Sequence, residues 1–173
     1  MAGPAINLQN VTKNFGANHV LRGVGLDIPA GGSVVVIGPS GTGKTVLLKT
    51  LIGVYAPDGG SLTLIASELA HLGRAKFAAY CASKAGVIGL TRALAHEFAP
   101  RVRVNAVAPG PTDTPMLSAE VMSPVALALE TQNPMGRIGT PQEIAAAVVF
   151  LASPGASFMT GQTICPSGGA VML

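Results

Sequence analysis

Hydrophobic and polar residues alternate in two stretches near the start of the chain. Apolar side chains recur at every second position at Ile6 and Leu8, and again at Val24, Leu26 and Ile28. A period of two is typical of a strand that is buried on one face only. We therefore expect two half-buried strands here, and antiparallel pairing suits strands of this kind.

Short segments rich in apolar residues follow at 33–37, where Val34 to Ile37 are uninterrupted, at 62–66 and at 102–108, with a last short segment at 162–165. Runs of this kind indicate strands that are covered on both faces, as in parallel sheets. Each run is short enough for a strand and is followed by glycine, proline or polar residues. The pattern therefore predicts a buried sheet in the later part of the chain.

Two segments between these runs repeat their apolar residues at helical spacing. Residues 44–54 form the first expected helix, and the turn residues of Pro57–Gly60 end it. The second expected helix covers residues 79–98, and its buried stripe is expected at Val87, Leu90, Leu94 and Phe98. Prolines interrupt the segment 111–137, so we expect only short helical pieces there.

A third expected helix carries the clearest start signal in the chain. Thr140 can cap it, Pro141 suits its first turn, and Glu143 can reach back to complete a capping box. Its buried stripe is expected at Ile144, Val148 and Leu151. Because strands and helices alternate from residue 33 onward, the pattern predicts an α/β fold: a three-layer, Rossmann-like parallel sheet with a small N-terminal antiparallel β hairpin.

Composition narrows the class of protein. Of the 173 residues, 49% are hydrophobic and 11% are charged, which fits one globular domain. No run of about 18 apolar residues occurs, and the start does not resemble a secretion signal, so we expect no membrane insertion. The net charge of +3 is not clustered and aromatic residues are few, so nucleic-acid binding is not expected. Cys81 and Cys165 fit free thiols in a reducing cytoplasm.

Residues 38–45 read Gly-Pro-Ser-Gly-Thr-Gly-Lys-Thr, which is the Walker A phosphate-loop pattern between a predicted strand and a predicted helix. Glycines allow backbone N–H groups to surround phosphate oxygens, and the start of the helix adds positive potential. Lys44 would neutralise the outer phosphates and Thr45 would offer a hydroxyl to Mg²⁺. The candidate ligands are Gly38, Pro39, Ser40, Gly41, Thr42, Gly43, Lys44 and Thr45; the alternative is a plain glycine-rich turn.

Residues 6–61 resemble the N-terminal part of an ABC-transporter ATP-binding domain. The resemblance rests on the Walker A loop, on 11–16 (Val-Thr-Lys-Asn-Phe-Gly) and on 20–32. It implies that Phe15 stacks on adenine, although an ordinary aromatic residue at a strand end would look the same. The glutamine loop, the signature segment and the Walker B acid of that family are missing, so the resemblance implies ATP binding with Mg²⁺ but negligible hydrolysis.

Tyr80 and Lys84 are four residues apart and therefore lie on one face of the helix expected at 79–98. A nearby ammonium group favours the phenolate form of a tyrosine, which makes the tyrosine a usable acid or base. Ser67 follows the strand expected at 62–66, so its hydroxyl can converge on the same place. By itself this spacing is a weak signal, since surface pairs of tyrosine and lysine are common.

Residues 62–173 resemble the C-terminal half of the short-chain dehydrogenase/reductase family. The matching segments are 79–85 (Ala-Tyr-Cys-Ala-Ser-Lys-Ala), 103–110 (Arg-Val-Asn-Ala-Val-Ala-Pro-Gly), 134–139 and 160–169. The resemblance implies that Ser67 orients the substrate oxygen, Tyr80 transfers the proton, and Lys84 binds the nicotinamide ribose. It implies NAD or NADP as cofactor, homo-oligomers, and a nicotinamide flanked by Pro109, Gly110, Thr112 and Thr114.

The family's glycine-rich dinucleotide turn and its catalytic asparagine are missing from this chain. Asp58 lies about twenty residues after the first apolar run, where dinucleotide folds place a ribose contact, but its Pro-Asp-Gly context favours a turn residue. The sequence therefore predicts two segments, 1–61 and 62–173, fused into one α/β domain. We expect the strand at 33–37 to lie beside the strand at 62–66 and to bring Lys44 opposite Tyr80.

Three functions remain open at this point. The first is an oxidoreductase of short-chain dehydrogenase/reductase type that acts on a small molecule, with its activity impaired by the missing half of the dinucleotide site. The second is a P-loop ATP-binding module that lacks hydrolytic machinery. The third is an inactive chimeric scaffold. Parallel titration with NADH, NADPH and ATP separates them.

Overall fold

The computed structural model describes residues 4–29, 36, 39–51, 58–115, 117–118 and 120–172. Within these ranges it contains the strands β1 (Pro4–Phe15), β2 (Asn18–Pro29), β3 (Gly59–Ile65), β4 (Val102–Val107) and β5 (Thr163–Ile164). The helices are α1 (Lys44–Leu51), α2 (Leu69–Leu72), α3 (Ala78–Phe98), α4 (Pro124–Glu130) and α5 (Pro141–Ala152), with a short 3₁₀ turn at Pro154–Ala156. The expected strand at 33–37 falls outside the described residues except for Val36.

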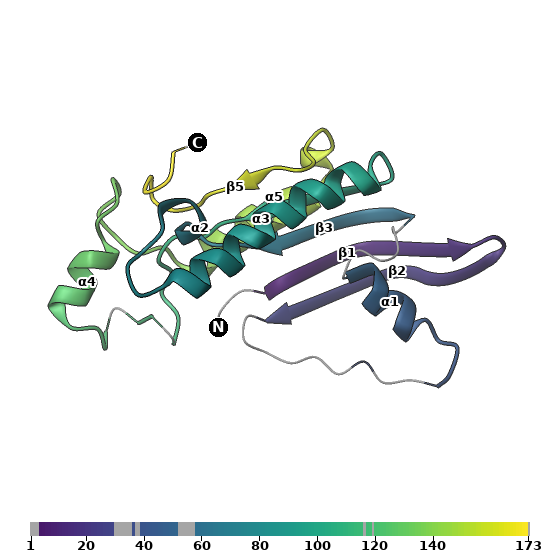
Figure 1. Cartoon of the computed structure of the whole chain (residues 1–173), viewed down its shortest axis with the longest axis horizontal. Helices are drawn as coiled ribbons and strands as arrows, with labels where there is room; N and C mark the ends of the chain where they lie inside the picture. Colours follow the sequence, from purple (N-terminus) through teal and green to yellow (C-terminus); the bar gives the residue numbers. More distant parts are fainter. Residues whose placement is uncertain are drawn as a thin grey trace.

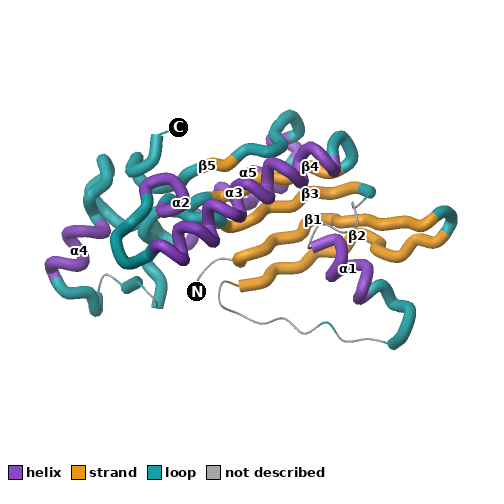
Figure 2. Tube along the Cα trace, in the orientation of Figure 1, coloured by secondary structure: helices purple, strands orange, loops and turns teal. Residues whose placement is uncertain are grey.

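The strands form one five-stranded mixed sheet in the order β2-β1-β3-β4-β5. The hairpin of β1 and β2 is antiparallel, as the alternating pattern predicts, and β1 also pairs antiparallel with β3. The pairs β3–β4 and β4–β5 are parallel, as expected for the apolar-rich segments 62–66, 102–108 and 162–165. Figure 2 shows the hairpin extending the same sheet on the side away from β5. The fold is therefore a Rossmann-like α/β sheet with an N-terminal antiparallel hairpin.

The strand that lies beside β3 differs from the one that the sequence predicts. β3 has β4 on one side and β1 on the other, with Ile6 paired to Leu64 and Gln9 to Ser61. The two neighbours of β3 are thus β1 and β4, and β1 takes the position beside β3 that was expected for residues 33–37, which lie outside the described residues except for Val36. An antiparallel hairpin occupies this position because β1 presents Leu8 and Val11 to the same core as β3.

Helices cover the two faces of the sheet unequally, as Figure 1 shows. On one face, Leu94 and Phe98 of α3 and Leu47 of α1 pack on β1, β3 and β4. On the other face, α5 packs Val148 and Leu151 against β4 and β5. These layers arise because successive residues of β4 point to opposite faces of the sheet.

The side chain of Arg103 shows how α5 is held on its face of the sheet. Its guanidinium donates hydrogen bonds to the carbonyl oxygens of Leu151 at 2.7 Å and Ala156 at 2.9 Å. The last carbonyls of a helix have no partner within the helix and carry negative potential, so the half-buried guanidinium of Arg103 is favourable there. At the other end of α5, the expected capping box of Thr140 and Glu143 is present.

The helices agree with the expected boundaries to within a few residues, but the buried face of α3 differs from the predicted one. The buried side of α3 carries Ile88, Thr91, Leu94, Ala95 and Phe98. Leu90, which the sequence analysis placed in the stripe, is 41% exposed. The sheet contacts a face of α3 that is turned by about one residue, and periodicity alone does not fix that rotation. No helix of the described ranges is both long and apolar enough to cross a bilayer.

Candidate active site

Ser67 lies just beyond the carboxyl end of β3. The Ala66 N–H donates a hydrogen bond to Val107 O at 2.7 Å, so the pairing with β4 continues one step past the strand. Ser67 is buried, and its hydroxyl oxygen accepts the N–H of Leu69 at 3.2 Å. The Glu68 N–H donates to Pro109 O at 3.0 Å. These bonds hold the Ser67 turn against the loop that follows β4.

Tyr80 and Lys84 approach the same point from the first two turns of α3. The Lys84 ammonium donates a hydrogen bond to Ile65 O at 2.9 Å and lies 5.8 Å from the centroid of the Tyr80 ring. Burial of the Lys84 side chain lowers its pKa. Tyr80 remains 43% exposed, so its phenol is accessible to a substrate. The structure thus brings Ser67, Tyr80 and Lys84 to one end of β3, as the sequence predicts.

The segment 109–114 forms the opposite side of this site. The Gly110 N–H donates to Pro166 O at 3.1 Å, and the Thr112 hydroxyl donates back to Gly110 O at 2.9 Å. Thr114 forms a short antiparallel bridge with Leu117. A Cβ atom at position 110 would lie 2.8 Å from Ser167 Cα, so the close approach of these two backbones requires glycine. The loop is therefore fixed between the Ser67 turn and the segment after β5.

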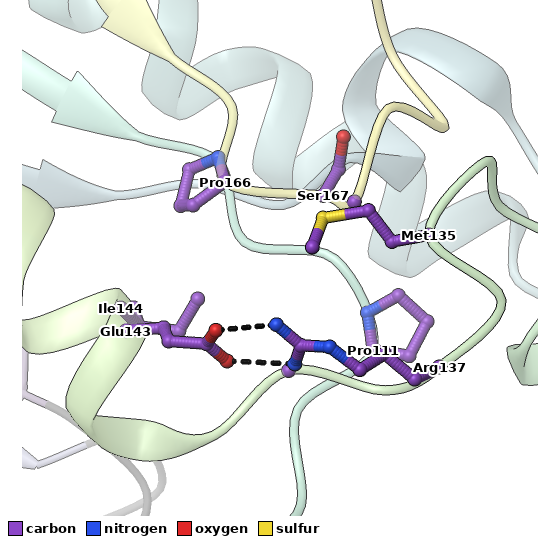
Figure 3. A pocket seen from close by; sticks show the side chains of 9 residues that line it. Pro111, Met135, Arg137, Glu143, Ile144, Pro166 and Ser167 are labelled. Atoms are coloured by element: carbon purple, nitrogen blue, oxygen red, sulfur yellow. Dashed lines mark hydrogen bonds and ion pairs between the residues drawn. The ribbon is translucent and has the colours of Figure 1, made fainter.

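A small cavity of about 140 Å³ adjoins this loop. In Figure 3 the Arg137 guanidinium and the Glu143 carboxylate lie side by side on its floor, joined by two hydrogen bonds, and Met135 covers the opposite side. The lining residues are Pro111, Met135, Arg137, Gly139, Glu143, Ile144, Pro166, Ser167 and Gly168. Ser67, Tyr80 and Lys84 do not line it, so the cavity is a neighbour of the candidate site.

Two features of the site were missed in the sequence analysis. Glu68 is buried beside Ser67, and its carboxyl oxygen Oε2 has no hydrogen-bond partner among the described residues. A charged residue two positions after the expected strand 62–66 was the available signal for it. Arg74 binds Glu130 through two hydrogen bonds, at 2.7 and 3.1 Å, and so ties α4 to the loop before α3. Arg74 and Glu130 are far apart in sequence, and no local sequence pattern indicates their contact.

The described part of the Walker A loop lies at the other end of the sheet. A Cβ atom on Gly43 would lie 2.9 Å from Val20 Cγ1, which places the loop against β2 near the hairpin turn. That part of the hairpin is level with Gly59, the first residue of β3, whereas Lys84 contacts Ile65, the last one. Six residues of strand separate these two levels, which is about 20 Å. Figure 1 shows α1 and the start of α3 correspondingly far apart.

The prediction that Lys44 and Tyr80 share one pocket is therefore wrong. The Lys44 ammonium instead donates hydrogen bonds to Pro39 O and to the Thr42 hydroxyl within its own loop. Gly38 lies outside the described residues. Asp58 pairs with Lys13 at 3.0 Å and accepts the Asn14 N–H, so it joins β1 to β3 and does not face the candidate site. The described residues contain no cluster of His, Cys, Asp and Glu side chains that could hold a metal ion.

Comparison with known proteins places this site in a family context. The family model described as enoyl-(acyl carrier protein) reductase matches residues 8–171. The 3-oxoacyl-(acyl-carrier-protein) reductase FabG of Vibrio cholerae is 44% identical over 124 residues, which are 71% of this chain and 50% of that protein. The cis-4-hydroxycyclohexanecarboxylate dehydrogenase of Sinomonas cyclohexanicum is 38% identical over 148 residues, which are 83% of this chain and 57% of that protein.

Solved structures give the same result. A short-chain dehydrogenase/reductase from Brucella melitensis has a TM-score of 0.64 and 35% identity, covering 77% of this chain and 55% of that one. A second one, from Serratia marcescens, has a TM-score of 0.59 and 36% identity, covering 65% and 46%. This chain spans about half the length of the curated relatives it matches. The comparisons support the resemblance seen in residues 62–173; the ATP-binding resemblance of residues 6–61, and a join between two families, stay predictions.

Proposed function

Because this chain belongs to the short-chain dehydrogenase/reductase family, we propose that it interconverts a carbonyl and an alcohol with NAD or NADP at Ser67, Tyr80 and Lys84. The observation that carries the proposal is the convergence of these three side chains at the carboxyl end of β3. An exposed phenol, a buried hydroxyl and an ammonium group form the donor set that proton transfer to a carbonyl oxygen requires. The substrate is a small molecule.

Each residue has a separate task in the proposed reduction. The Ser67 hydroxyl, held on a rigid turn, orients the carbonyl oxygen of the substrate. The Tyr80 hydroxyl gives its proton to that oxygen while the carbonyl carbon gains a hydride, which the bound nicotinamide supplies. The Lys84 ammonium, 5.8 Å from the tyrosine ring centroid, stabilises the phenolate left behind. Oxidation of the alcohol runs through the same groups in reverse.

The described residues suit the nicotinamide end of such a cofactor. Lys84 has donors beyond the one that it gives to Ile65 O, and these can bind ribose hydroxyls. Pro109, Gly110, Thr112 and Thr114 would lie along the nicotinamide, since their loop faces the Ser67 turn. The phosphate loop is at the other end of the sheet and cannot hold the pyrophosphate of the same molecule.

Binding and turnover test the proposal together. NADH, NADPH and ATP with Mg²⁺ are titrated in parallel, and nucleotide oxidation is then followed with acetoacetyl-CoA and with other small ketones. We expect a nicotinamide nucleotide to bind best, and Tyr80→Phe to lower kcat by about 10²–10⁴-fold with little effect on nucleotide affinity. Ser67→Ala should also lower kcat, whereas Ser83→Ala is the matched control, because the Ser83 side chain is exposed and its hydroxyl donates a hydrogen bond to the backbone oxygen of Tyr80. Equal turnover by Tyr80→Phe and the unsubstituted protein would refute the assignment.

ATP binding at residues 39–45 is the second candidate function, and one observation favours it. Gly43 contacts Val20 near the hairpin turn, and Phe15 lies at the end of β1 beside that same turn. Gly41 and Gly43 have φ angles of +83° and +86°, which only glycine adopts readily, so the loop keeps a backbone suited to anions. Lys44→Ala should abolish ATP binding without changing NADH binding. If none of NADH, NADPH and ATP binds, the remaining hypothesis is that the protein is an inactive scaffold.

A further inference from the structure

The Glu68 side chain is enclosed by three segments of the candidate site. The residue is 5% exposed and directly follows Ser67. Its Oε2 atom would be 3.0 Å from a Cβ on Gly110, and Ser167 Cα would be 2.8 Å from the same point. Oε2 finds no hydrogen-bond partner among the described residues. The carboxyl group is thus packed against the backbone of the Pro109–Gly110 loop and next to Ser167.

The charged groups around Glu68 do not neutralise it. Arg74 is the cation that faces it, and that guanidinium is already bound by Glu130 of α4 through two hydrogen bonds. Cys165, after β5, adds no positive charge. Burial is the main cause that raises the pKa of Glu68 to about 7, with Arg74 opposing the shift and Glu130 adding to it. The acid is therefore uncharged in mildly acidic solution and ionises within the neutral range.

We propose that Glu68 is a positioning residue whose uncharged side chain packs the Ser67 turn against the Pro109–Gly110 loop, and that loss of its proton displaces this loop and weakens binding of the nicotinamide nucleotide. The inference rests on the proposed function, because it assigns the loop to the cofactor site. It adds control of cofactor affinity by a carboxyl group that does not touch the reacting atoms.

The physical reason is the cost of a buried charge whose Oε2 atom has no hydrogen-bond donor among the described residues. A carboxylate in this position must recruit water or move toward Arg74 to be solvated. On the side of Gly110 and Ser167 there is no room even for a methyl group, because a Cβ at position 110 would lie 2.8 Å from Ser167 Cα and 3.0 Å from Glu68 Oε2. The cheapest response is to separate the loop from the Ser67 turn. That movement strains the Glu68 N–H to Pro109 O bond of 3.0 Å and the Gly110 N–H to Pro166 O bond of 3.1 Å.

Nucleotide titration at pH 6 and pH 8, either side of the pKa of about 7, measures the effect. If only the protonated form binds well, the Kd for NADH or NADPH rises about tenfold between these pH values. Glu68→Gln keeps the shape without the proton, so its Kd should be constant within about twofold and equal to the low-pH value of the unsubstituted protein. The matched control is Glu97→Gln, at an exposed position of α3, which should retain the tenfold change.

Hydrogen exchange of the Gly110 amide, corrected for its intrinsic pH dependence, gives a second measurement without nucleotide. We expect exchange to accelerate from pH 6 to pH 8 in the unsubstituted protein and in Glu97→Gln, and not in Glu68→Gln. An identical pH dependence of Kd in Glu68→Gln and the unsubstituted protein would overturn the inference and leave the proposed function standing. Failure of every variant to bind nicotinamide nucleotides would overturn the proposed function, whether or not the exchange responds, and with it the effect on affinity.

Discussion

Replacement of Glu68 by glutamine should stabilise the fold at neutral pH and above, although it removes a buried side chain of the native site. Glutamine has nearly the same shape and carries no charge at any pH. In the native protein the pKa of Glu68 rises from 4.5 to about 7, because burial disfavours the carboxylate. Each unit of pKa shift corresponds to about 1.36 kcal/mol, so the full penalty on the native state is about 3 kcal/mol.

The sign follows from proton binding. Between pH 4.5 and 7 the native state keeps the Glu68 proton while the unfolded chain has released it. Stability therefore falls as pH rises through this window, and it levels off above the native pKa. From pH 5 to pH 8 the loss attributable to Glu68 is about 2.5 kcal/mol, and glutamine at this position does not suffer it.

Urea unfolding at a series of pH values measures this difference. We expect Glu68→Gln to unfold at a higher urea midpoint than the unsubstituted protein at pH 8, with a gap that shrinks toward pH 5. In thermal unfolding, about 3 kcal/mol corresponds to roughly 6–12 °C for a chain of this size. Glu97→Gln, at an exposed site, should follow the unsubstituted protein at every pH. A constant gap between pH 5 and pH 8 would show that Glu68 titrates normally, and the reasoning about its burial would be wrong.

Two further predictions concern the segments around the site. Gly110→Ala places a Cβ 2.8 Å from Ser167 Cα, which is a backbone atom and cannot turn aside, so the substitution should lower the free energy of unfolding by about 1–3 kcal/mol in a urea titration. The control is Gly89→Ala in α3, where a Cβ meets open space, and this substitution should raise the free energy of unfolding by up to about 1 kcal/mol in the same titration. Arg74→Ala removes both hydrogen bonds to the mostly buried carboxylate of Glu130, so the backbone amides of α4 should exchange hydrogen faster and the free energy of unfolding should drop by about 1.5–3 kcal/mol. Unchanged exchange in α4 would show that the Arg74–Glu130 pair does not hold this helix in place.

Much of the site could be predicted because its signals are local. Tyr80 and Lys84 share a helix face by their spacing alone, and Ser67 is placed by the end of a strand that its apolar run reveals. The capping box of Thr140 and Glu143 is likewise a matter of neighbours in sequence. The Arg137–Glu143 pair and the Arg74–Glu130 pair were not foreseen, because opposite charges in a sequence give no sign of which ones will meet.

The sequence by itself determined the elements of this protein: the alternating hairpin strands, the buried parallel strands, the helices with their caps, and the residue types that carry chemistry. The tertiary structure decided which strands are neighbours. The pairing of β1 with β3 put the phosphate loop and the Tyr80–Lys84 pair at opposite ends of β3, about 20 Å apart along the strand, and the closure of two loops over Glu68 buried a carboxyl group. Both outcomes depend on contacts between segments that are distant in sequence. These contacts are stabilised by burial of the surface that the segments share, and no local sequence pattern indicates them.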